Sequence, residues 1–81
     1  GQAQAAAKTA QANLAQTRAQ VPQAESNLRL AQVEYNRRLA LFNRGDISRQ
    51  NLDQALNAMQ GAQSQLNSAQ AAVIAVRHER G

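Results

Sequence analysis

The chain has 81 residues, among them 18 alanines and 13 glutamines, with no cysteine and no tryptophan. So short a chain forms at most one domain, and its 17 apolar residues larger than alanine are too few for an ordinary globular core. The scarcity of β-branched residues argues against a sheet protein. Nine basic residues outnumber five acidic ones, but they are scattered without aromatic residues between them for base stacking, so we expect no nucleic-acid partner.

The N-terminal half predicts one long helix over residues 2–44. Apolar residues recur there at alternating steps of four and three, the heptad spacing of a coiled coil. Pro22 lies inside this pattern, but the heptad phase is unbroken on both sides, so we expect a kink rather than an end. The alternative is a helix end near Gln20 and a three-helix bundle. The first heptad stripe comprises Ala3, Ala7, Ala10, Leu14, Thr17, Val21, Ala24, Leu28, Ala31, Tyr35, Arg38 and Phe42.

Residues 43–48 (NRGDIS) predict a stop, a short link and a new start. Gly45 suits the C′ position of a helix end, where the backbone is left-handed. Ser48 suits the N-cap of the next helix, where its hydroxyl accepts from a free backbone N–H. We therefore expect a turn at residues 45–47 and a second helix over residues 48–79. Its heptad stripe is apolar throughout: Leu52, Ala55, Met59, Ala62, Leu66, Ala69, Val73 and Val76.

Together these elements predict an all-α fold, an antiparallel two-helix coiled-coil hairpin that forms a single domain over residues 1–81. The second helix is the shorter one, so residues 1 to about 12 are expected to lack an intramolecular partner. Leu30 and Val33 lie off the first stripe, where a two-helix hairpin leaves them facing water. We expect the chain to be a fragment of a larger protein and to self-associate.

Little in the sequence predicts catalysis. His78, the one histidine, lies close to the C-terminus, where we expect an exposed side chain without the pocket and partner that acid–base chemistry needs. No metal-ligand spacing and no glycine-rich phosphate loop occurs. We expect no enzyme activity, no cofactor and no metal. The N-terminus lacks the apolar core of a signal peptide, and the uncharged residues 54–76 include too many amides for a membrane span, so no direct membrane insertion is expected.

A mixed cationic and apolar surface is expected at the tip, which we define as residues 37–48. Arg37, Leu39, Leu41 and Ile47 are predicted to lie exposed there, and arginine is favoured in protein interfaces. The spacing Arg37-x3-Leu41-x6-Ser48 resembles the R-x3-L-x6-S tip motif of periplasmic adaptor proteins, also called membrane fusion proteins, of tripartite efflux pumps and type I secretion systems. The alanine- and glutamine-rich arms resemble that family's α-helical hairpin. Residues 35–38 (YNRR) are similar to the branch that works with major-facilitator drug exporters.

The resemblance implies an adaptor in the periplasm of a Gram-negative bacterium, with the parent chain anchored to the inner membrane. Its tip would dock with a TolC-like outer-membrane channel, and flanking β-rich domains would reach an inner-membrane transporter. Arg37 would make a polar contact with the channel, Leu41 would insert between channel helices, and Ser48 would add a hydrogen bond. Gly45 and Ile47 would shape the tip. The alternatives are a generic structural or oligomerising coiled coil without a tip partner, and an amphipathic helix on anionic lipid.

Overall fold

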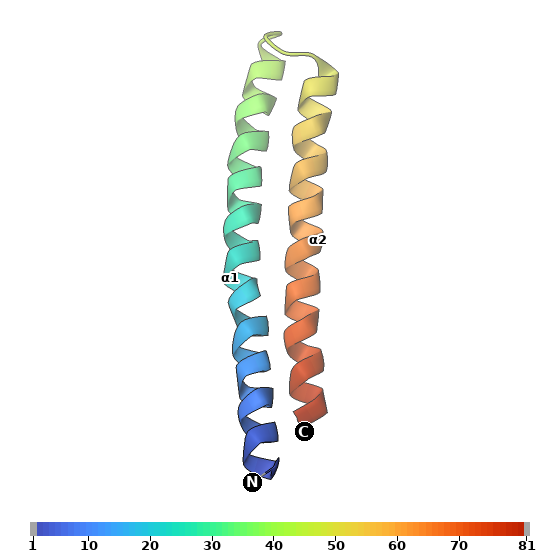
Figure 1. The fold of residues 1–81 in the computed structure, drawn as a ribbon. Coiled ribbons are helices and arrows are strands. Elements are labelled where there is room, and N and C mark those ends of the chain that lie inside the picture. The colour runs from blue at the N-terminus through green and yellow to red at the C-terminus, as the bar shows by residue number, and fades with distance from the viewer. Residues whose placement is uncertain (1, 81) are drawn as a thin grey trace.

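The computed structural model describes residues 2–80, with side chains as far as Arg77. This part of the chain forms two helices, α1 at Gln2–Asn43 and α2 at Arg49–Arg80, which lie side by side and run in opposite directions (Figure 1). The molecule measures 66 × 15 × 14 Å and its radius of gyration is 18.7 Å, whereas a compact domain of this length has about 12 Å. The predicted all-α hairpin is confirmed. Helix α1 begins at Gln2 as expected, and the other three helix boundaries each differ by one residue from the expected ones.

The two helices meet along the predicted heptad stripes. Every position of the second stripe is buried or half-buried, and so is every position of the first stripe from Ala10 onward. The most buried side chains are Leu14, Ala24, Leu52, Ala55, Leu66 and Ala69. Alanine alternates with larger residues, which lets the helix axes approach closely and makes the core thin. Even Ala55, the most buried of these, keeps 4% of its surface exposed.

Helix α1 continues through Pro22 without a break. The heptad residue after it, Ala24, forms a buried cluster with Leu66 and Ala69 of α2, and the residue before it, Val21, packs against this cluster. This packing offsets the hydrogen bond that a proline removes, whose loss in a helix interior costs about 3 kcal/mol. The three-helix alternative is therefore wrong, and the expected kink stays a prediction.

The N-terminal arm of α1 extends beyond α2. In Figure 1 the N-terminal end of α1 projects past the C-terminal end of α2, and the side chains of residues 2–9 are all exposed. The expected unpaired arm is confirmed, because α2 is ten residues shorter than α1. Over the residues that the structure describes, no helix combines the length and hydrophobicity that crossing a bilayer requires.

Candidate functional site at the hairpin tip

The end of α1 is built around Gly45. This residue has a φ of 80°, a left-handed conformation that only glycine adopts at little cost. The N–H of Gly45 donates to the carbonyl of Phe42 at 2.9 Å, and the N–H of Asp46 donates to the carbonyl of Leu41 at 2.9 Å. These two bonds form a Schellman motif, which satisfies carbonyls that the helix end would otherwise leave free. The predicted C′ role of Gly45 is confirmed.

The start of α2 is capped by Ser48. Its Oγ accepts a hydrogen bond from the N–H of Asn51 at 3.1 Å, and its carbonyl accepts from the N–H of Leu52 at 3.2 Å. This is N-cap geometry, as predicted. The cap uses the hydroxyl oxygen as an acceptor, so the hydroxyl hydrogen of this exposed residue can still be donated to another group.

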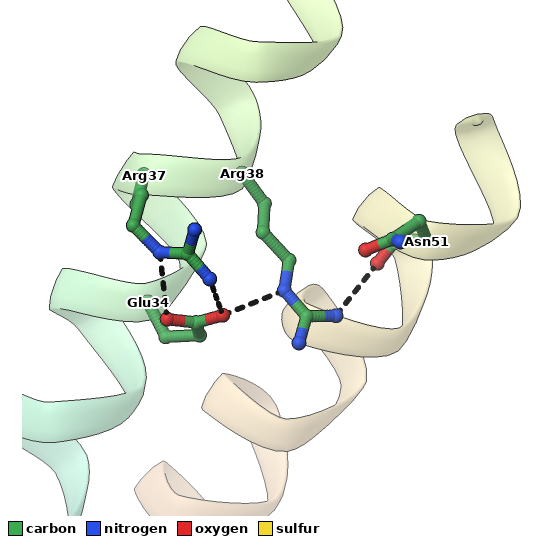
Figure 2. A network of polar contacts seen from close by, with 4 residues as sticks. All are labelled: Glu34, Arg37, Arg38 and Asn51. Carbon is green, nitrogen blue, oxygen red and sulfur yellow. Dashed lines mark hydrogen bonds and ion pairs between the residues drawn. The ribbon is translucent and has the colours of Figure 1, made fainter. Parts of the chain in front are cut away.

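Arg37 lies on α1 with an exposed side chain that is paired with Glu34. Its Nε donates to Oε2 of Glu34 at 3.1 Å and its Nη2 donates to Oε1 at 2.6 Å. Arg38 donates from Nε to the same Oε1 at 2.7 Å and from Nη1 to the backbone carbonyl of Asn51 at 3.2 Å. Figure 2 shows these four residues as one network that joins the two helices where the tip begins.

The two arginines keep Glu34 charged. Hydrogen bonds from Arg37 and then from Arg38 are the main causes that lower the pKa of Glu34 to about 2. The hydrogen bonding between Arg37 and Glu34 in turn raises the pKa of Arg37. The Glu34 carboxylate and the Arg37 guanidinium therefore stay ionised across the physiological pH range.

The sequence analysis missed Glu34 and Asn51 and gave Arg38 no role. Arg37 and Arg38 follow Glu34 by three and four residues, which is the spacing of helical ion pairs, so this part of the network could have been found. The bond from Arg38 to Asn51 depends on how α1 and α2 face each other. It also explains why a charged residue occupies a heptad position, since its half-buried guanidinium finds acceptors on both helices.

The apolar side chains of the tip are less exposed than expected. Leu39, Leu41 and Ile47 are half-buried, not exposed. Leu39 and Leu41 adjoin the half-buried stripe positions Arg38 and Phe42 in sequence, so each lies beside the helix interface. At the end of α1, the bond from Asp46 to the carbonyl of Leu41 also folds the link back over the helix. The exposed large apolar residues among the described side chains are Leu30 at 70%, Val33 at 62% and Ile74 at 55%. The expected exposure of Leu30 and Val33 is thus confirmed.

Two further arginines at this end of the rod have acidic neighbours. Arg44 Nε lies 3.6 Å from Asp46 Oδ2, and Arg49 Nε lies 3.5 Å from Asp53 Oδ1. The guanidinium carbon of Arg49 also lies 6.0 Å from the centre of the Phe42 ring, a distance at which a cation–π attraction operates. All four side chains of the two ion pairs are more than half exposed, so these pairs contribute little stability.

Two further features of the described surface lie away from the tip or concern metal-ligating side chains. Within residues 2–77, no group of three or more His, Cys, Asp or Glu side chains could hold a metal ion. Two open grooves of about 450 and 390 Å³ lie between the helices away from the tip. The residues that line the first are mostly Gln, Asn and Ser, and those that line the second include Val21, Pro22 and Ile74. The side chain of His78 lies outside the described residues.

Residues 13–78 match the family described as "RND MFP, alpha-helical hairpin domain", whose members are structural adaptor domains of periplasmic tripartite systems in Gram-negative bacteria. The description refers to RND-type systems, and the branch that works with major-facilitator exporters stays a prediction. No curated protein and no solved structure matches the chain. The match spans both helices and the turn, and the chain therefore belongs to the α-helical hairpin domain family of RND membrane fusion proteins.

Proposed function

We propose that this hairpin is a non-catalytic adaptor that docks through its tip with a TolC-like outer-membrane channel and links it to an inner-membrane transporter in drug efflux or secretion. One observation carries the proposal. The turn around Gly45 brings Arg37, Leu41 and Ser48, spaced as in the family's tip motif, to one end of a rod 66 Å long. The family membership of the chain supports the adaptor role itself.

The three motif residues offer complementary chemistry. Arg37 has a side chain that is 61% exposed, and its guanidinium suits carbonyl and carboxylate oxygens. A channel that ends in helical hairpins exposes such oxygens, because the last carbonyls of a helix have no partner within it. Leu41 is half-buried, so the hairpin restricts its rotamers and presents its remaining surface as a fixed apolar contact. Ser48 can donate its hydroxyl hydrogen while it caps α2.

The length of the rod supports a bridging role. Helix α2 alone has 32 residues and so spans about 48 Å at 1.5 Å per residue. The N-terminal end of α1 and the C-terminal end of α2 both lie at the end of the rod opposite the tip (Figure 1). Any domain joined to either terminus would therefore lie a rod's length from the channel contact, as a link between two membranes requires.

The alternative is a structural or oligomerising coiled coil without a tip partner. The exposed side chains of Leu30 and Val33, together with the unpaired residues 2–9, favour it. In that case substitutions along the heptad stripes, for example at Leu52 or Leu66, would affect function, and substitutions at Arg37 would not.

Binding of the chain to a purified TolC-like channel, measured by surface plasmon resonance, tests the proposal. We expect Arg37→Asp and Leu41→Ala each to weaken binding more than about tenfold, with helicity by circular dichroism unchanged. Matched controls are Arg29→Asp and Leu30→Ala, because both residues are exposed on α1 outside the tip. Wild-type affinity in both tip variants, or an equal loss in the controls, would refute docking through the tip. In the full-length parent, the same tip variants are expected to abolish export.

A further inference from the structure

We infer that Glu34 is a positioning residue for tip docking, which holds the guanidinium of Arg37 by one side so that its other edge faces an oxygen acceptor on the partner. This inference rests on the proposed docking function and adds to it a residue outside the tip motif. It also specifies which N–H groups of Arg37 make the contact.

The geometry of the pair shows which donors are in use. Glu34 accepts from Nε of Arg37 at 3.1 Å and from Nη2 at 2.6 Å, so two parallel bonds occupy the Nε side of the guanidinium, as in a bidentate pair. A guanidinium has five N–H donors. Both donors on Nη1 and one on Nη2 remain. One N–H of Nη1 and one of Nη2 lie along the edge that points away from Nε, and the second N–H of Nη1 points to the Cδ side. The side chain of Arg37 is 61% exposed, so a partner can reach that edge.

Glu34 is itself held in place by the second arginine. Its Oε1 also accepts from Nε of Arg38 at 2.7 Å, and Arg38 donates onward to the carbonyl of Asn51 on α2 at 3.2 Å. The side chain of Arg38 is only 28% exposed, so the interface between the helices restricts its motion. The orientation of Arg37 is thereby held relative to both helices (Figure 2).

This arrangement addresses a specific cost of binding. A long exposed arginine samples many rotamers, and ordering it on association lowers affinity. An arginine that is already ordered by two bonds avoids much of that cost. The carboxylate stays ionised wherever the hairpin functions, because the pKa of Glu34 is about 2, so the anchor does not depend on pH in the neutral range.

A double-mutant cycle against a purified TolC-like channel tests the inference. We expect Glu34→Gln to weaken binding about fivefold, the size of effect that immobilising one long side chain produces. In the Arg37→Ala background the same change is expected to have no effect, because no guanidinium remains to be oriented. Glu25→Gln is the matched control, since it removes the same charge from an exposed site on α1 that lies outside the network.

A second measurement reports on the free chain. Nitrogen-15 relaxation of the Arg37 Nε–H is expected to show an ordered group in the wild type and in Glu25→Gln, and a mobile group in Glu34→Gln. A role for Glu34 in helix stability alone would not produce this difference, and circular dichroism is expected to show the same helicity in all three.

The outcomes separate the inference from the proposal on which it rests. If the wild type binds the channel and Glu34→Gln binds as tightly, Glu34 does not position Arg37 for docking. If Glu34→Gln binds more tightly, Glu34 competes with the partner for Arg37. Either result overturns the inference while docking stands. If Glu34→Gln weakens binding equally with and without Arg37, the effect does not pass through Arg37 and the inference is again overturned. If the wild type does not bind the channel, the docking proposal fails and the positioning role fails with it.

Discussion

The turn that creates the tip can be tested with two glycines that lie in opposite backbone environments. Gly45 has a φ of 80° at the end of α1, whereas Gly61 lies inside α2. A methyl group added at either position meets no atom of a more distant residue within 4 Å. The same substitution, glycine to alanine, therefore tests backbone conformation alone at both sites.

The expected effects have opposite signs. At Gly45 alanine has to adopt the left-handed conformation, which costs about 1–2 kcal/mol, and the reduced entropy of the unfolded chain returns about 0.4–1 kcal/mol of this. Gly45→Ala should thus lower the free energy of unfolding by about 1 kcal/mol. Gly61→Ala should raise it by about 0.5–1 kcal/mol, because alanine is the better residue inside a helix.

Thermal unfolding followed by circular dichroism at 222 nm measures the difference. In a chain of this size 1 kcal/mol corresponds to about 4–8 °C in Tm, so the two variants should melt on the order of 10 °C apart, with the wild type between them. A Gly45→Ala variant as stable as Gly61→Ala would contradict the left-handed turn and, with it, the position of the tip.

The remaining predictions concern the core, the cap and the ion-pair network. Leu66→Ala removes a side chain that is only 8% exposed, so it should lower the free energy of unfolding, measured in urea, by about 2–3 kcal/mol. Leu30→Ala changes a position that is 70% exposed and should alter the free energy of unfolding by less than about 0.5 kcal/mol. Ser48→Ala removes the N-cap and should cost about 1 kcal/mol in the same assay, and Ser68→Ala, at an exposed position inside α2, should cost nothing. The pKa of Glu34 is lowered from its ordinary 4.5 to about 2, so its contribution to stability is present above pH 4.5 and is lost as the pH falls through about 2. A carbon-13 NMR titration should place the midpoint of the Glu34 carboxyl near pH 2, and a midpoint near 4.5 would contradict the network. Between pH 4.5 and about 2, the decrease in Tm should be smaller in Glu34→Gln than in the wild type.

Much of the fold follows from local properties of the sequence. The heptad period determines which side of each helix is apolar, so the positions from Ala10 to Val76 that meet at the interface could be predicted before the helices were paired. The roles of Gly45 and Ser48 could be predicted for a similar reason. A helix end is decided by the conformation and hydrogen bonds of a few consecutive residues.

The state of the candidate site was only partly predictable. The motif of Arg37, Leu41 and Ser48 is visible in the sequence, and its role in partner binding remains a proposal. Pairing of Glu34 with the arginines that follow it is also a local property of a helix. The burial of Leu41 was not predictable in this way, because it depends on how the turn folds back over α1.

The sequence by itself thus determined the two helices, their apolar faces and the place of the turn, because each depends on residues within a few positions of one another. The tertiary structure alone decided that Arg38 reaches the carbonyl of Asn51 and that Leu39, Leu41 and Ile47 are half-buried. These contacts depend on the register of α1 against α2 and on the path of the link. Heptad spacing specifies which faces meet, but it leaves open which atoms on those faces come within hydrogen-bonding distance.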